Sequence, residues 1–130
     1  MAAMGPGLLA LVGVGHGDGE AQAEELARRL ANLRILPDAE GRMNRSLLEG
    51  AGALGVVSQF TLMGDARKGR RPSFVEAARP EQAEPLIARL VDAARELGLE
   101  VVAGRFGAHM EVSLLNDGPV TLLLDTERRF

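Results

Sequence analysis

The chain of 130 residues has no cysteine, tryptophan or tyrosine, and it has only two histidines. Without cysteine it has no disulfide, no thiolate nucleophile and no cysteine-ligated zinc site. Four phenylalanines are its only aromatic residues, so stacking on nucleic-acid bases depends on these four. Two histidines without cysteine make a structural metal site a poor expectation. We therefore expect neither a metal nor a cofactor.

Long hydrophobic runs are lacking too. The apolar stretch Leu8 to Val14 is far shorter than a membrane-spanning segment, and the residues before it have no basic n-region. Hydrophobic residues are 46% and charged residues 25% of the chain, both close to globular averages. The length fits one domain. We expect a single cytoplasmic domain over residues 1–130, without a membrane partner.

The charge is unevenly distributed. A net charge of −3 argues against non-specific binding of nucleic acid, DNA included. Residues 64–79 nevertheless hold five basic and two acidic side chains. Such a basic segment on an acidic protein suits one localised phosphate-bearing ligand better than a long duplex. The candidate phosphate-binding residues within it are Arg67, Lys68, Arg70 and Arg71.

Hydrophobic periodicity predicts an α/β fold with two main helices. Helical spacing over residues 20–34 and 81–97 places apolar residues on one side of each segment, with Asp18 as an N-cap and Gly98 as a C-cap. Short apolar runs predict strands. These lie at residues 7–14, 33–36, 54–63, 99–106, 110–115 and 120–125, so the last third is predicted to be entirely strand and antiparallel.

A glycine-rich turn, residues 13–19, follows the first predicted strand and precedes a helix. This context suits a phosphate cradle, and Asp38 stands where a dinucleotide site has its ribose-binding acid. However, Asp18 occupies the place of the third glycine, and its charge repels phosphate. A tight turn is therefore favoured over a nicotinamide-dependent oxidoreductase.

A second segment, Ser58-Gln59-Phe60-Thr61-Leu62, leads into the basic residues. Strand alternation would put Ser58 and Phe60 on one face and Gln59 and Thr61 on the other. A hydroxyl at such a strand end could meet a substrate ester. Spacing places neither histidine beside these hydroxyls as a base, so ordinary strand residues remain the alternative.

Two further segments allow a structural and a functional interpretation. Asn116-Asp117-Gly118-Pro119-Val120-Thr121 has turn-forming residues, but a cis Gly-Pro bond there would also orient two carbonyls toward a ligand ammonium group. Phe106 and Met110 flank Gly107 and could form an apolar slot for a purine, or simply belong to the core.

Together, these segments resemble the D-aminoacyl-tRNA deacylase (D-tyrosyl-tRNA(Tyr) deacylase) family. The similarity is carried by residues 58–62, 67–74, 104–110 and 116–121 and extends from Gly5 to about Asp125. It implies a homodimer with a three-layer α/β/β arrangement. Members of this family begin with a strand hairpin that has no counterpart before Gly7, so we expect an N-terminally short domain.

The resemblance also implies an activity: hydrolysis of the ester between a D-amino acid and the terminal adenosine of tRNA. Glycine mischarged on alanine tRNA would be a further substrate. The ribose 2′-hydroxyl would assist, which agrees with the missing side-chain base. Ser58, Gln59, Phe60 and Thr61 would line the pocket, with backbone amides near the last two polarising the carbonyl.

The resemblance also implies roles for residues that would contact the second subunit or the tRNA. A cis Gly118-Pro119 would enter the partner's pocket, capture the α-amino group and exclude an L side chain. Asn116 and Thr121 belong to the same motif, and Phe106 and Met110 would hold the terminal adenine. The alternative is a non-catalytic RNA-binding or dimerisation relative, which the intact Ser58–Thr61 and Gly118-Pro119 segments disfavour.

Overall fold

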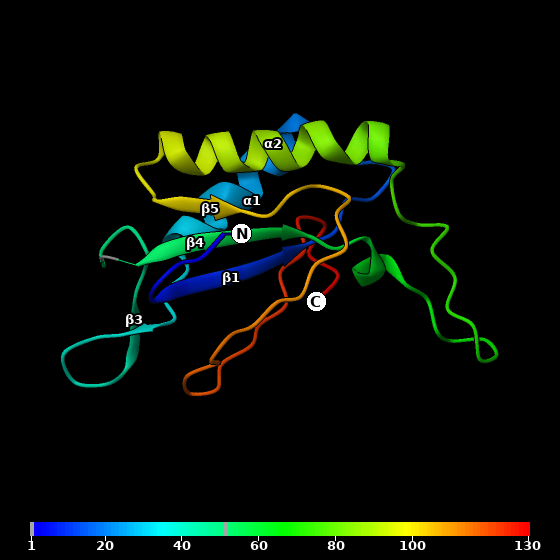
Figure 1. Cartoon of the computed structure of the whole chain (residues 1–130). Helices are drawn as coiled ribbons and strands as arrows, with labels where there is room; N and C mark the ends of the chain where they lie inside the picture. The colour runs from blue at the N-terminus through cyan, green and yellow to red at the C-terminus, as the bar shows by residue number, and fades with distance from the viewer. Residues whose placement is uncertain (1, 51) are drawn as a thin grey trace.

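The computed structural model describes residues 2–50 and 52–130 and shows a sheet with both helices packed on one face (Figure 1). No helix in these residues has the length and apolar character that crossing a bilayer requires. The elements in chain order are β1 (Gly7–Val12), α1 (Glu20–Asn32), β2 (Leu36–Pro37), β3 (Met43–Arg45), β4 (Ala53–Ser58), the 3-10 helix η1 (Phe60–Met63), α2 (Pro80–Glu96) and β5 (Val101–Ala103).

The main sheet is parallel and has the strand order β1-β4-β5. Its register pairs Leu8 with Leu54 and Leu54 with Val101. Helix α1 lies between β1 and β4 in the chain, and α2 lies between β4 and β5. Two right-handed crossovers that progress in one direction across a sheet put their helices on the same face. Within the described residues, the opposite face therefore has no helix over it (Figure 1).

The core lies between this sheet and the two helices. Leu54 and Leu90 are almost completely buried, and Ala31 and Ala94 have no exposed surface at all. Small alanines allow α1 and α2 to pack closely, and Arg89 of α2 adds an ion pair to Glu24 of α1 at 3.0 Å. The open side of β1 is different, because Leu9 and Leu11 remain 37% and 46% exposed.

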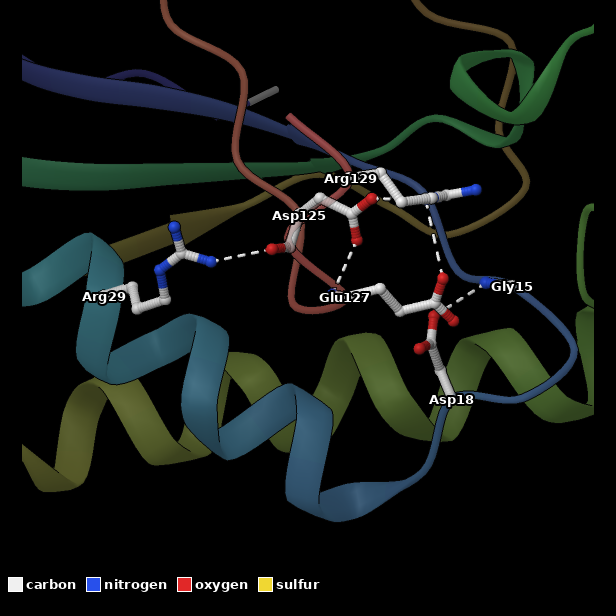
Figure 2. Close-up of polar contacts among 6 residues, drawn as sticks. All are labelled: Gly15, Asp18, Arg29, Asp125, Glu127 and Arg129. Atoms are coloured by element: carbon white, nitrogen blue, oxygen red, sulfur yellow. Dashed lines mark hydrogen bonds and ion pairs between the residues drawn. The ribbon is translucent and has the colours of Figure 1, made fainter.

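The ends of the helices agree with the predicted positions to within about two residues, with one correction. Gly98 follows α2 with φ +100°, its N–H donates to Arg95 O, and Leu99 N donates to Ala94 O, which is a Schellman motif. Asp18 is not the N-cap of α1, because Gly19 takes that position. The Asp18 carboxylate instead accepts from Gly15 N at 2.8 Å (Figure 2).

The predicted turn after residue 36 forms a small hairpin. Strands β2 and β3 pair antiparallel, and the Asp38 carboxylate accepts from the N–H groups of Arg42 and Glu40. These hydrogen bonds, together with one from the Asn44 side chain, hold the pKa of Asp38 below its ordinary value. Asp38 is therefore fully engaged in the turn, which leaves the ribose-binding role without support.

The mixed α/β class with two main helices is confirmed, but the C-terminal third differs from the prediction. Only Val101–Ala103 of the predicted strand 99–106 is a strand, and residues 110–115 and 120–125 form none in the part of the chain described. All residues from 111 to 123 are exposed. We call residues 107–123 the arm, since they project from the body on the side away from the helices (Figure 1). Among the described residues no backbone hydrogen bond joins 110–115 to 120–125, so neither segment belongs to a ladder.

Candidate active site

The candidate site begins where β4 ends, at Ser58. Gln59 N donates to Val12 O at 2.8 Å, which joins this point to the end of β1. The chain then leaves the sheet as η1, in which Leu62 N donates to Gln59 O and Gly64 N donates to Thr61 O. The prediction of a strand through residue 63 is wrong, because these local bonds replace ladder bonds. The side chains of residues 58–62 therefore do not alternate between two faces of a strand, as the sequence predicted.

The 3-10 turn gives the segment a different arrangement of polar groups. The Gln59 side-chain amide donates to the Thr61 hydroxyl, so these two side chains contact each other. Phe60 is more than half exposed. The first N–H used by the turn is that of Leu62, so the amides of Phe60 and Thr61 precede it and are left available at its N-terminal end.

Two glycines let η1 lie close to its neighbours. A Cβ on Gly13 would be 3.1 Å from Met63 Sδ and 3.3 Å from Gln59 O. A Cβ on Gly64 would be only 2.9 Å from both Thr61 O and Phe74 Cε1. The glycine-rich turn thus makes room for η1, which supports the tight-turn interpretation of residues 13–19.

The basic residues form a loop that starts and ends beside η1. Asp65 and Ser73 exchange two backbone hydrogen bonds of 2.7 and 2.8 Å, which close the loop at its base. We call residues 66–72 the basic loop. Just beyond it, the ring of Phe74 packs edge-on against Phe60, with centroids 5.3 Å apart. The sequence did not indicate this pairing, although two of the four phenylalanines flank the loop.

Arg67 differs from the other basic residues of the loop. Its Nε and Nη2 donate to the two carboxylate oxygens of Asp65 at 2.9 and 2.7 Å. This paired geometry lowers the pKa of Asp65 to about 2 and neutralises the Arg67 charge locally. Lys68, Arg70 and Arg71 are exposed and form no ion pair within the described residues, so they are the cations presented to solvent.

The Gly118-Pro119 bond in the arm is cis, as the resemblance implies. Asn116 holds the turn around it: its Nδ2 donates to Thr121 Oγ1 at 3.0 Å, and its Oδ1 accepts from Val120 N at 3.3 Å. The predicted residues Asn116 and Thr121 are therefore brought together. The tip of the arm lies beyond β1, well apart from η1 in the same chain (Figure 1).

Phe106 and Met110 lie where the chain passes from β5 into the arm. Phe106 is partly buried against the core. The Met110 side chain lies over Gly104, where an added Cβ would be 3.4 Å from its Cε, and Gly104 N donates to Val56 O. Both residues are thus near the carboxyl ends of the central strands rather than at the arm tip.

Ser58 and Gln59 are half-buried in one copy, and Phe60 and Thr61 are exposed. Two surface hollows lie elsewhere, one around Asp38 on the β2–β3 hairpin and one beside Pro6 and Leu36, and residues 58–61 line neither. In residues 2–50 and 52–130 there is also no group of three His, Asp or Glu side chains placed to hold a metal ion. The candidate site is therefore an open surface made of backbone amides, hydroxyls and aromatic rings.

Comparisons with known proteins identify the family. Residues 1–125 match the family model described as D-Tyr-tRNA(Tyr) deacylase. Three curated relatives are named D-aminoacyl-tRNA deacylase. The protein of Symbiobacterium thermophilum is 58% identical over 98% of this chain and 84% of its own length. That of Thermomicrobium roseum is 56% identical over 97% and 82%, and that of Roseiflexus sp. is 59% identical over 95% and 80%.

Solved structures agree with this assignment. A structure of the c-Myc DNA Unwinding Element Binding Protein superposes with a TM-score of 0.87 at 34% identity, covering 95% of this chain and 84% of that one. A structure described as a probable eukaryotic D-amino acid tRNA deacylase gives 0.69 at 17% identity over 82% and 77%, and shows the fold alone. The chain belongs to the D-Tyr-tRNA(Tyr) deacylase family, a family of hydrolases.

Proposed function

We propose that this chain hydrolyses the ester bond of D-aminoacyl-tRNA and releases the free amino acid and the tRNA. The observation that carries this proposal is the 58% identity to a D-aminoacyl-tRNA deacylase over 98% of the chain. The matched region includes both the Ser58–Thr61 segment and the Asn116–Thr121 segment. Hydrolysis adds water to the ester carbonyl and returns the hydroxyl to the terminal ribose.

The receiving half of the site is the N-terminal end of η1. The amides of Phe60 and Thr61 are not used by the 3-10 hydrogen bonds, so they are available to a carbonyl oxygen that gains negative charge in the transition state. The contact between Gln59 and Thr61 orders the two polar side chains of this turn. Ser58 completes the lining from the end of β4.

The proton acceptor in this proposal is the ribose 2′-hydroxyl of the substrate. The two histidines of the chain are engaged or remote in the structure. His16 contacts Val75 O through its Nε2 at 2.5 Å, and His109 is exposed within the arm. Among the described residues neither forms a hydrogen bond to η1, which supports assistance by the substrate itself.

Selection for a D-amino acid is assigned to Gly118-Pro119 of a second copy. Its main-chain oxygens would accept hydrogen bonds from the substrate α-ammonium group and leave no room for an L side chain. The separation of the arm tip from η1 within one chain supports a contribution from the partner (Figure 1). Glycine has no side chain to exclude, so glycyl-tRNA mischarged on alanine tRNA is proposed as a substrate too.

A homodimer is proposed because the arm tip lies apart from η1 of its own chain (Figure 1), and because large apolar side chains are exposed. Contiguous apolar side chains on a soluble protein commonly mark an interface. The open sheet face exposes Leu9 and Leu11, and the arm exposes further large apolar side chains. In the arm these are Val112, Leu114, Leu115, Val120, Leu122 and Leu123.

The tRNA is proposed to contact two regions. Lys68, Arg70 and Arg71 of the basic loop would meet its phosphates, while Arg67 mainly holds the loop through Asp65. Phe106 and Met110 would contact the terminal adenine. A protein acting on aminoacylated tRNA is expected in the cytoplasm.

Deacylation of D-tyrosyl-tRNA, L-tyrosyl-tRNA and glycyl-tRNA on alanine tRNA tests the proposal directly. We expect rapid release from the D-ester, release from the glycyl ester, and no release from the L-ester above the rate without enzyme. Binding of tRNA without any release would contradict the proposal and favour a non-catalytic RNA-binding relative. Equal rates on D- and L-esters would contradict the assignment to Gly118-Pro119.

A further inference from the structure

The orientation of the arm is determined at its two ends. The arm follows Phe106, which packs against the core two residues after the Gly104 N–H donates to Val56 O at 3.0 Å. The chain returns to the body at Leu124, which also packs against the core. Between these points all residues from 111 to 123 are exposed. The direction of the arm tip is therefore fixed by the contacts that the two ends of the arm make with the body.

The returning end is held by one side chain of helix α1. Arg29, in the last turn of that helix, donates from Nη1 to Asp125 O at 2.8 Å (Figure 2). The same carbonyl accepts from Arg128 N at 2.9 Å, which closes a turn. Arg29 thereby ties the chain directly after Leu124 to a helix that lies 96 residues earlier in the sequence.

The side chain of Asp125 strengthens this turn. It is only 10% exposed, and it accepts from Arg129 Nε at 2.5 Å and from Glu127 N at 2.9 Å (Figure 2). The Arg129 guanidinium holds the pKa of Asp125 below its ordinary value, so the carboxylate stays charged at neutral pH. Arg128 adds an ion pair to Glu25 of α1 at 3.7 Å. We call residues 124–129 the C-terminal anchor.

We infer that Arg29 is a positioning residue for deacylation, because it fixes the C-terminal anchor and thereby the direction of Gly118-Pro119. This inference rests on the proposed function. Pro119 lies six positions before Asp125 in the chain, a span of about 20 Å when extended. At that distance, a tilt of about 5° at the anchor moves the tip by nearly 2 Å. A misplacement of about 1 Å can cost on the order of a hundredfold in rate.

Chiral selection is the property most sensitive to this positioning. Exclusion of an L side chain depends on where the Gly118-Pro119 carbonyls lie, whereas phosphate binding depends on the basic loop at another end of the molecule. Loss of the Arg29 contact is therefore expected to change rate and selectivity with little change in affinity for tRNA. A residue that served only folding would change the melting temperature and leave the D/L ratio of the folded enzyme unaltered.

The first experiment compares Arg29→Ala, Arg29→Lys and the control Arg28→Ala in single-turnover deacylation, well below their melting temperatures. Arg28 is the exposed neighbour on α1, and its side chain makes no hydrogen bond or ion pair in the described residues. We expect Arg29→Ala to lower the D-ester rate and the D/L ratio about tenfold or more. Arg29→Lys should restore part of the D-ester rate and part of the D/L ratio, since lysine keeps an N–H donor for Asp125 O. Arg28→Ala should match the wild type.

A second readout does not require activity. Because the chain has no cysteine, Ser113→Cys carries a single spin label on the arm, and its mobility is compared among these variants at the same oligomeric state. Arg29→Ala should increase the mobility of the spin label, and Arg28→Ala should leave it unchanged. An inactive wild type would overturn the proposed function. An active wild type with unchanged ratio and label mobility in Arg29→Ala would overturn this inference alone.

Discussion

At the scale of single residues, Gly64 shows how closely η1 is packed. We predict that Gly64→Ala destabilises the protein by about 1 to 3 kcal/mol, because the new methyl group would overlap the backbone oxygen of Thr61 and the ring of Phe74. The displaced turn should also lower the deacylation rate. Urea unfolding and single-turnover kinetics measure the two effects. Gly17→Ala is the matched control, since no atom lies within 4 Å of its Cβ position.

The ion pair between Asp65 and Arg67 gives a prediction for pH. Arg67 holds the pKa of Asp65 at about 2, below the ordinary 3.8. The pair therefore stabilises the folded state at pH values above 3.8, the ordinary pKa. This contribution disappears as the pH falls from 3.8 through about 2. In Arg67→Ala the pKa should return toward 3.8. Carboxyl-carbon NMR titration measures it, and an unchanged midpoint would contradict the assignment to Arg67.

At the scale of elements, the basic loop combines one structural and several exposed cations. We predict that the double variant Arg70→Gln/Arg71→Gln weakens tRNA binding and reduces the salt slope by about 1 for each arginine removed. Arg67→Gln should reduce the slope less, because Asp65 already neutralises that side chain. Filter binding over a range of salt concentrations tests both. Equal slopes for the wild type and the double variant would exclude these arginines from the interface.

Two segments differ from the secondary structure that their hydrophobic periodicity predicts. The sequence predicts one long strand over residues 54–63, whereas the structure ends β4 at Ser58 and forms η1. The reason is tertiary: Gly13 and Gly64 leave the space into which the turn folds, and Phe74 packs against it. Alternating residues 110–115 and 120–125 have strand character but form no ladder within the described residues. A periodic pattern reports which residues could be buried, and a strand also requires a neighbour.

At the scale of the whole molecule, the exposed apolar side chains of the arm give a test of the proposed homodimer. Leu115 is 90% exposed in one chain, so Leu115→Glu should scarcely alter the stability of a single folded chain. In the proposed homodimer it would bury a charge, and the dissociation constant should rise about tenfold or more. Sedimentation at several protein concentrations measures this. Met43→Glu, at an exposed site on β3, is the control.

A dimer unaffected by Leu115→Glu would place the interface elsewhere. A monomeric wild type that still discriminates D- from L-esters would contradict the contribution of Gly118-Pro119 from a partner. Together with the Arg29 variants, these measurements separate arm docking from arm orientation, because Arg29 lies on α1 and not among the exposed apolar residues.

The sequence alone determined both helices, the strand-forming cores of β1 and β4, the stop at Gly98 and the family, since these depend on local periodicity and short motifs. Only the tertiary structure decided that η1 replaces the end of a strand, that Phe74 meets Phe60, and that Arg29 holds Asp125 from 96 residues away. Local patterns record whether a residue is buried or exposed. Which distant residue it meets is decided by how the sheet and helices pack.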